Sequence, residues 1–175
     1  MRKILFTLAL LASPGLAEAA PAPLPTVAAV DMTRYAGGWY EIALLPSWFQ
    51  RSCVADTKAR YRADGDGIEV LNRCRKADGS IETAKGHATV VEGSGNAKLR
   101  VSFFWPFKGD YWVLDLDADY QHVLVGTPSR KYAWVLSRTP TMDEASLQRL
   151  LDKAATLGFD KAAFKRSPQT QPLLD

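Results

Sequence analysis

The stretch GDYWVLDLDADYQHVLVGTPSRKYAWVLSR, residues 109–138, contains three short runs rich in Tyr, Trp, Val and Leu. The runs are separated by residues 117–119 and 126–130, two breaks that are too short for a helix and consist of turn-forming residues. Consecutive strands joined by such short turns pair antiparallel. The stretch therefore predicts three neighbouring strands of an antiparallel meander.

The same period-2 pattern extends upstream, with turn signals at residues 64–67, 76–79 and 93–96. The strands predicted from these signals are near 39–45, 53–62, 67–75, 81–91, 97–104, 110–116, 121–126 and 131–138. Sequential strands joined by short turns avoid exposed edges by closing into an up-and-down barrel. The sequence therefore predicts an all-β, eight-stranded antiparallel barrel, a size that can hold one small ligand.

A helical pattern follows Pro140. Thr141 and Glu144 have the spacing of a capping box, and Gly158 is placed to end the helix. The apolar stripe of this helix is made of Leu147, Leu150, Leu151 and Ala154. We expect one C-terminal α-helix that packs on the outside of the barrel.

The first 19 residues have the pattern of a secretory signal peptide: cations at Arg2 and Lys3, an apolar run over residues 4–12, and small residues before Ala20. The apolar run is about half of the ~20 residues that a spanning helix needs. Residues 20–30, rich in Pro and Ala, are expected to form an extended leader, and residues 31–175 one domain.

The formal net charge of the 175 residues is +3, and it becomes +2 when the predicted signal peptide is removed. Lys and Arg are dispersed among Asp and Glu rather than clustered, so we expect no nucleic-acid partner. No motif suggests a cofactor.

Counting alternate strand ends brings Trp39, Asp119, Tyr120 and Arg138 to one end of the barrel, which we call the closed end. We expect Arg138 to pack over the Trp39 indole, while Asp119 and Tyr120 fix the neighbouring turn. The functional alternative makes Arg138 an anion receptor.

Three segments resemble the signature segments of the lipocalins: Gly38-Trp39-Tyr40-Glu41-Ile42-Ala43, Asp119-Tyr120 and Leu136-Ser137-Arg138-Thr139-Pro140. The phrases YEIA, VSFFWPF, LVGTPSRKYAWVLSRTP and LGFD resemble the bacterial, apolipoprotein D-like branch, and the resemblance covers the mature chain. One departure is Ala118, where lipocalins usually have threonine.

The resemblance implies a calycin barrel that is not an enzyme. It further implies binding, transport or storage of fatty acids or lysophospholipids, contributing to maintenance of the bacterial cell envelope. Many bacterial relatives are acylated at a cysteine at the cleavage site, but the first cysteine here is Cys53. This predicts an exported periplasmic protein without that anchor and leaves outer-membrane association open.

The opposite end of the barrel, the mouth, collects four loop aromatics that we call the rim: Trp48, Phe49, Trp105 and Phe107. Aromatics with no strand to bury them would surround an open mouth. The alternative is that they fold inward and plug the barrel. An exposed rim leaves peripheral membrane contact open, and the sequence also leaves a homodimer open.

Cys53 and Cys74 lie near the mouth, almost opposite each other on the hairpin that turns at residues 64–67. In an exported protein, two such cysteines predict a disulfide. The alternative is a reactive Cys-His pair, but His87 and His122 have no spacing typical of catalysis or of a metal site.

Arg138 fixes the phase of the last strand and Trp39 that of the first, while charges expected to face water, such as Lys58 and Arg100, fix the second and fifth. On the sixth strand both phases contain large residues, and we place Tyr111 and Val113 inside because Trp112 and Leu114 can pack under the helix. The side chains expected to face the lumen and bind ligand are Glu41, Ala43, Ala59, Tyr61, Ala88, Val101, Phe103, Tyr111, Val113, Tyr132, Trp134 and Leu136. This is the mixture of a pocket for an apolar ligand, in which Glu41 and the tyrosines are polar handles for a headgroup.

Two other functions remain open. A lipocalin-like enzyme acting on an apolar substrate would use Glu41 as its acid or base, and a pure interaction module would have a filled barrel. Asp115 and Asp117 share a strand face, as paired catalytic carboxylates could, but more simply cap a strand end. Asp64 and Asp66 belong to a hairpin turn, so no metal site is expected.

Overall fold

The period-2 pattern of the chain produces one antiparallel sheet that closes on itself. The structure is a computed structural model, which describes residues 23–65 and 67–174; the predicted signal peptide lies outside them. In chain order the elements are α1 (Met32–Tyr35), β1 (Gly37–Leu44), η1 (Trp48–Gln50), β2 (Cys53–Asp64), β3 (Gly67–Lys76), β4 (Ile81–Val90), β5 (Lys98–Phe104), β6 (Phe107–Leu116), β7 (His122–Gly126), β8 (Ala133–Ser137), α2 (Glu144–Thr156), η2 (Lys161–Ala163) and β9 (Lys165–Arg166).

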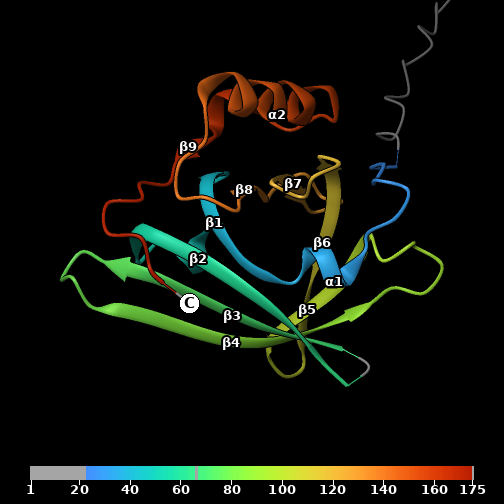
Figure 1. Ribbon diagram of the computed structural model, residues 1–175, viewed down its shortest axis with the longest axis horizontal. Coiled ribbons are helices and arrows are strands. Elements are labelled where there is room, and N and C mark those ends of the chain that lie inside the picture. Colours follow the sequence, from blue (N-terminus) through green and yellow to red (C-terminus); the bar gives the residue numbers. More distant parts are fainter. Residues whose placement is uncertain (1–22, 66, 175) are drawn as a thin grey trace, which may run out of the picture.

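Each strand from β2 to β7 pairs antiparallel with the next one, and β1 pairs with both β8 and β2. Figure 1 shows the resulting barrel, with α2 lying across one outer face. The predicted barrel and external helix are confirmed, and the predicted strands differ from the observed ones only at their ends. Within the described residues, the short strand β9 was not predicted; it extends the sheet beside Ala43 and Leu44 of β1.

Two apolar clusters lie on opposite faces of the barrel wall. The outer cluster joins Leu147 and Leu150 of α2 to Leu124 and Val135 of β7 and β8. The inner cluster fills the closed end around Trp39, Val123 and Val125. Successive β7 residues therefore contribute to alternate clusters, as the alternation of side chains along a strand requires.

The closed end is covered by α1 and by the segment that precedes it. Asp31 caps α1 by accepting hydrogen bonds from the N–H groups of Thr33 and Arg34. The described part of the expected leader is extended, but it packs on the barrel: Val27 N–H donates to Val113 O (3.0 Å) and Val30 is buried in the inner cluster. These contacts cover the closed end, so the lumen opens at the mouth.

The helix α2 begins differently from the prediction. Asp143 is its N-cap and accepts from Ser146 N–H (2.9 Å), so the predicted Thr141–Glu144 capping box is wrong. Asp and Thr are both good N-caps, and here the helix begins two residues later than the pattern suggested. Its predicted end is confirmed, because Gly158 adopts the left-handed conformation (φ +85°).

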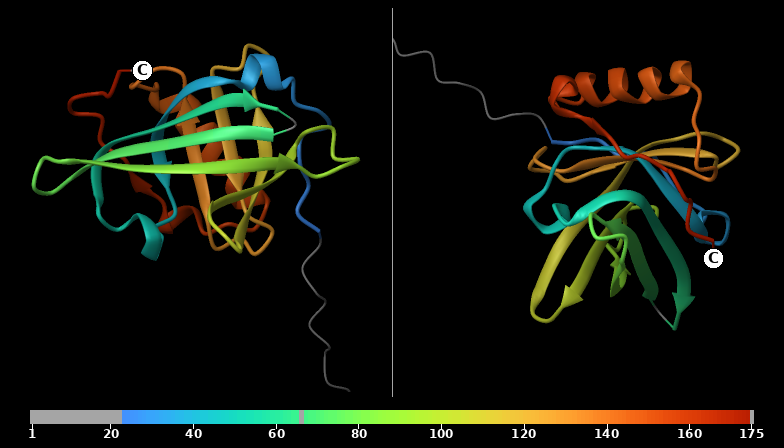
Figure 2. Two further views of the ribbon diagram at one scale, coloured as in Figure 1. Left: turned by 90° about the horizontal axis from the view of Figure 1, so that it is seen from below. Right: turned by 90° about the vertical axis from the view of Figure 1, so that its left-hand side faces the viewer.

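The end of the chain forms a strap, which we define as residues 167–174, on the outer face of β1 and β2 (Figure 2). Asp56, in the left-handed region at φ 55° and fully buried, accepts from the N–H groups of Thr170 (2.6 Å) and Gln171 (2.9 Å) and from Arg75 Nε (2.6 Å). Lys58, expected to face water, is instead 4% exposed because its ammonium donates to Leu173 O (2.9 Å).

Candidate ligand-binding cavity

The lumen contains a cavity of about 630 Å³ that reaches from the mouth toward the inner cluster. It lies inside the barrel because residues at alternate positions of the strands face inward. Nine of the side chains expected in the lumen line it: Glu41, Ala59, Tyr61, Val101, Phe103, Tyr111, Tyr132, Trp134 and Leu136. The phases predicted for β2, β5 and β8 from their charged residues therefore agree with the lining.

Three expected lumen residues lie elsewhere. Ala88 and Val113 are inside the barrel but belong to the inner cluster that closes it, below the cavity. Ala43 belongs to the outer cluster, so its predicted inward orientation is wrong. The reason is a bulge in β1: Glu41 pairs with Leu136 but Ala43 with the adjacent Val135, so the extra residue Ile42 reverses the alternation.

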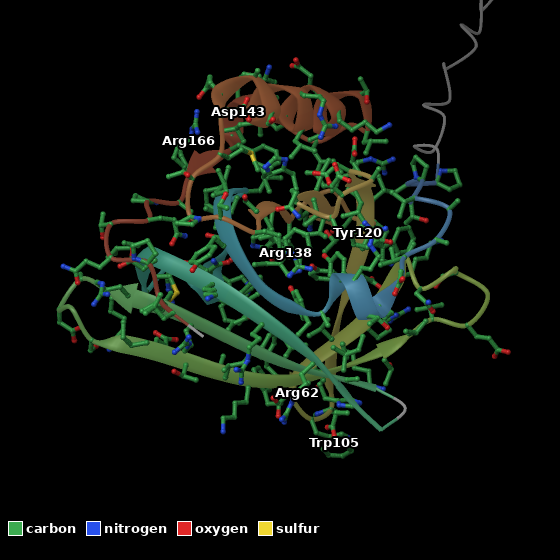
Figure 3. The ribbon with its side chains drawn as sticks, in the orientation of Figure 1. Arg62, Trp105, Tyr120, Arg138, Asp143 and Arg166 are labelled. Atoms are coloured by element: carbon green, nitrogen blue, oxygen red, sulfur yellow. A yellow bond between two sulfur atoms is a disulfide. The ribbon has the colours of Figure 1, made fainter. Side chains whose placement is uncertain are left out.

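The rim residues are exposed at the mouth and do not plug the barrel, and Trp48, Phe49 and Phe107 border the cavity there. Trp105 is 90% exposed and Trp48 68% exposed, and Phe107 is also exposed. Figure 3 shows Trp105 projecting from the lower edge of the molecule. Phe49 is the rim residue most closely attached to the wall, through edge contacts to the Tyr132 ring (5.2 Å between centroids). The mouth is therefore bordered by apolar surface.

Glu41 is the buried acid of the cavity wall, 4% exposed. Its two carboxylate oxygens accept from Gln50 Nε2 (2.6 Å) and from Ser167 Oγ of the strap (2.5 Å). Gln50 in turn accepts from Trp134 Nε1 (3.1 Å). Burial raises the pKa of Glu41 to about 7, and these two hydrogen bonds only partly offset it.

The predicted closed-end residues do come together. The Arg138 guanidinium lies 3.9 Å from the centroid of the Trp39 ring and donates to Gly38 O (2.9 Å) and Tyr120 O (3.2 Å). The Tyr120 hydroxyl accepts from Asp31 N–H (2.9 Å), and the Asp119 carbonyl accepts from a neighbouring side chain in the same turn. These contacts join β1, β8 and the β6–β7 turn outside the cavity.

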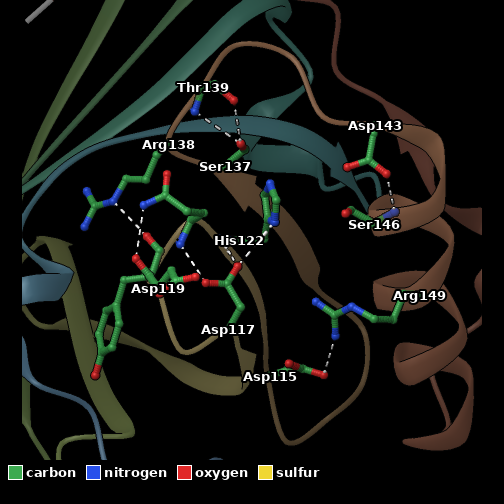
Figure 4. A network of polar contacts seen from close by, with 12 residues as sticks. Asp115, Asp117, Asp119, His122, Ser137, Arg138, Thr139, Asp143, Ser146 and Arg149 are labelled. Atoms are coloured by element: carbon green, nitrogen blue, oxygen red, sulfur yellow. Dashed lines mark hydrogen bonds and ion pairs between the residues drawn. The ribbon is translucent and has the colours of Figure 1, made fainter.

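Asp115 and Asp117, considered above as paired carboxylates, have separate partners (Figure 4). Asp117 accepts from the N–H groups of Gln121 (2.8 Å) and His122 (2.7 Å), which is the strand-end cap expected. Asp115 lies 3.3 Å from Arg149 of α2. Among the described residues, no three His, Cys, Asp or Glu side chains are grouped to hold a metal ion.

The predicted disulfide between Cys53 and Cys74 is confirmed, with a Cα–Cα distance of 5.5 Å. Both cysteines border the cavity, where the bond connects β2 to β3. Because the thiols are bonded, the alternative Cys-His pair is ruled out in this structure.

Sequence reasoning missed several residues of the site, among them two that line the cavity and one partner of Glu41. Gln50 directly follows two rim aromatics and could have been found from that position. Asn72 faces inward opposite Ala59, and its buried Oδ1 has no hydrogen-bond partner among the described residues. The phase of β3 would have identified it. Ser167 could not have been found, because 126 residues separate it from Glu41.

Comparisons with known proteins place this geometry in a family. A family model described as a lipocalin-like domain matches residues 30–169. Temperature-induced lipocalin-1 of Arabidopsis thaliana is 41% identical, over 84% of this chain and 83% of its own. The outer membrane lipoprotein Blc of Escherichia coli K12 is 40% identical over 77% and 76% of the two chains, and bovine apolipoprotein D is 31% identical over 70% and 68%.

Solved structures agree with this result at the level of the fold. Insecticyanin from the tobacco hornworm Manduca sexta matches with a TM-score of 0.68 and 22% identity, over 87% of this chain and 89% of that one. Apocrustacyanin C2 matches with a TM-score of 0.67 and 14% identity, over 88% and 94%. The barrel, its cavity and the sequence matches have one common explanation: the chain belongs to the lipocalin family, and within it resembles the bacterial Blc and apolipoprotein D type.

Proposed function

We propose that this lipocalin binds and carries single-chain lipids, such as fatty acids and lysophospholipids, in the bacterial cell envelope. The observation that supports this most directly is the cavity of about 630 Å³, walled by aromatic and aliphatic side chains and open at an aromatic rim. Burial of an acyl chain would supply the binding energy, at about 0.8 kcal/mol per methylene before the costs of association.

The test is a series of saturated fatty acids from eight to eighteen carbons, with affinity read from the fluorescence of Trp134, which lines the cavity. Affinity should increase several-fold with each added pair of carbons until the cavity is full. An affinity that does not change with chain length would contradict the proposal.

A matched pair of variants checks that binding occurs in the lumen. Ala84 lines the cavity, whereas its neighbour Thr83 on β4 does not. Ala84→Phe should weaken binding of hexadecanoic acid at least tenfold by filling the cavity, and Thr83→Phe should leave it within about twofold. Equal effects of the two substitutions would indicate a site elsewhere.

We further propose that the rim contacts the membrane from which the lipid is taken. Exposed Trp and Phe side chains are typical of segments that enter the membrane interface. Four relatives of this chain bear the name outer membrane lipoprotein. Trp105→Ser should reduce sedimentation with phospholipid vesicles. If the rim instead buries itself in a homodimer, sedimentation equilibrium of the free protein would give twice the monomer mass.

The enzyme alternative rests on Glu41, whose pKa of about 7 is suitable for a general acid or base. However, both of its oxygens accept hydrogen bonds from Gln50 and Ser167, which supports a structural role for the carboxyl group. We therefore favour a carrier without catalytic activity. In Glu41→Gln, loss of turnover of an apolar substrate with binding retained would favour the enzyme, whereas a modest change of affinity alone fits the carrier.

A further inference from the structure

The inner end of the cavity contains a cluster of three tyrosine hydroxyls, contributed by Tyr35, Tyr61 and Tyr111. Tyr61 of β2 and Tyr111 of β6 line the cavity, and Tyr35 of α1 lies beneath them, 1% exposed. Tyr61 Oη donates to Tyr111 Oη (3.1 Å), and the Tyr35 and Tyr111 hydroxyls are 2.7 Å apart. Three elements that are distant in sequence thus place this hydroxyl cluster inside a lumen whose walls are mainly apolar.

Counting protons shows that the hydroxyl cluster has a spare donor. Three phenols carry three protons, but within the described residues their hydroxyls form only two hydrogen bonds, both among themselves. If Tyr111 donated to Tyr35, the proton of Tyr35 would be buried beneath the cavity without an acceptor, which costs about 1–3 kcal/mol. The favoured arrangement has Tyr35 and Tyr61 both donating to Tyr111. Tyr111 then donates into the cavity.

The hydroxyl cluster is built for a neutral partner. Burial raises the pKa of Tyr61 to about 12, and raises the pKa values of Tyr35 and Tyr111 well above the usual one, so all three remain protonated donors. No hydrogen bond joins these hydroxyls to a Lys, Arg or His side chain of the described residues, and the charge of Arg138 lowers the pKa of Tyr35 by less than burial raises it. A carboxylate placed here would be a buried charge without a cation in hydrogen-bond contact, which is costly. A neutral oxygen carries no such penalty.

We infer that the hydroxyl cluster binds a neutral oxygen at the leading end of an acyl or alkyl chain, such as the terminal hydroxyl of an ω-hydroxy fatty acid or of a long-chain alcohol. A ligand hydroxyl would accept from Tyr111 and donate to the oxygen of Tyr61. This deepens and rests on the proposed function, because the apolar walls must first hold the chain. The specificity lies at the end of the chain that enters first, while the headgroup of an ω-hydroxy acid remains at the mouth.

The experiment compares two ligands that differ by one oxygen, hexadecanoic acid and 16-hydroxyhexadecanoic acid, by calorimetric titration. In the native protein the two dissociation constants should agree within about threefold, because the hydrogen bonds made in the cavity replace those the terminal hydroxyl makes to water. Tyr111→Phe should weaken binding of the hydroxy acid about tenfold, equivalent to about 1.4 kcal/mol, and leave hexadecanoic acid within about twofold.

Tyr132→Phe is the matched control, because Tyr132 also lines the cavity but lies outside the hydroxyl cluster. It should leave the ratio of the two dissociation constants unchanged. If Tyr111→Phe does not fold, as judged by circular dichroism, Tyr61→Phe replaces it and should also shift the ratio, because the ligand hydroxyl loses its acceptor.

Two outcomes overturn the inference. An identical ratio in the native protein and the variant means that water, not ligand, accepts the spare proton. If the native protein binds the hydroxy acid at least tenfold more weakly than hexadecanoic acid, the hydroxyl cluster does not compensate for the desolvation of the ligand's terminal hydroxyl. In both cases, binding of hexadecanoic acid leaves the proposed function intact, whereas failure of the native protein to bind either lipid overturns the proposed function as well.

Discussion

Replacement of Arg138 by alanine should destabilise the barrel without affecting its cavity. The guanidinium covers the Trp39 ring at 3.9 Å from its centroid and donates to the carbonyls of Gly38, Tyr120 and Arg34. These groups belong to β1, the β6–β7 turn and α1. One side chain therefore connects three segments at the closed end.

The magnitude follows from these contacts. Three hydrogen bonds contribute about 1 kcal/mol each, since the carbonyls can be partly rehydrated after the substitution. The cation–π contact contributes about 1 kcal/mol more. We expect a loss of about 3–4 kcal/mol in the free energy of unfolding. Arg138→Lys keeps the positive charge but not the planar guanidinium that donates several hydrogen bonds. It should lower the free energy of unfolding by about 2 kcal/mol.

The assay is equilibrium unfolding in urea, followed by tryptophan fluorescence. With a slope of about 2 kcal/mol per molar, Arg138→Ala should shift the midpoint by about 1.5–2 M. Arg100→Ala is the control: its partner Asp110 is 3.1 Å away, but the arginine side chain is 54% exposed, so its loss should cost less than about 1 kcal/mol.

Two results would refute this reasoning. If Arg138→Ala shifts the midpoint no more than Arg100→Ala does, the contacts of Arg138 carry no stability. If instead it abolishes binding of hexadecanoic acid while the midpoint stays unchanged, Arg138 is an anion receptor, the alternative kept open from the sequence.

Three further predictions concern the wall and the strap. Reduction of the bond between Cys53 and Cys74, which are 21 residues apart, should cost about 3 kcal/mol in the chain-entropy model; urea unfolding with and without reductant measures this, and no change would contradict it. The folded-state pKa of Glu41 is raised from its ordinary value of 4.5 to about 7, so its contribution to stability is fully present below about pH 4.5 and is lost as the pH rises through 7. It amounts to about 3 kcal/mol, and Glu41→Gln should remove this pH dependence whereas Glu92→Gln, at an exposed site, should not. Burial acts to raise the pKa of Asp56, but the hydrogen bonds from Arg75 and the strap outweigh it and lower the pKa. Asp56→Asn should therefore cost about 3 kcal/mol at neutral pH and make the strap sensitive to limited proteolysis; a strap as resistant as in the native protein would count against the contacts assigned to Asp56.

The barrel could be predicted because its determinants are local. Each turn signal lies between two strands that pair with each other, so order and direction follow from the chain alone. The phase of β8 likewise follows from Arg138, because a cation at a strand end leaves only one face for Trp134 and Leu136. Where such a marker exists, the predicted lumen residues are the observed ones.

The errors occur where pairing partners distant in sequence decide the conformation. The bulge that turns Ala43 outward depends on the register between β1 and β8, about ninety positions later in the chain. No feature of the sequence near Ala43 indicates this bulge. The burial of Lys58 depends in the same way on Leu173 of the strap. Alternation is a reliable guide only as long as the register with the neighbouring strands is regular.

Glu41 shows what such a distant contact does to the interpretation of a site. From the sequence it is an inward acid, available as a handle for a polar headgroup. In the structure its oxygens accept from Gln50 and from Ser167 of the strap, and Gln50 also accepts from Trp134. Glu41 therefore connects the strap to η1 at the mouth, and its carboxyl group has less capacity to bind ligand. Lys85 and Lys108, which also line the cavity, are exposed, whereas the buried polar groups still able to bind ligand, the hydroxyl cluster and Asn72 Oδ1, are neutral. A ligand with neutral oxygen atoms along or at the end of its chain fits these buried groups better than one that buries a charge.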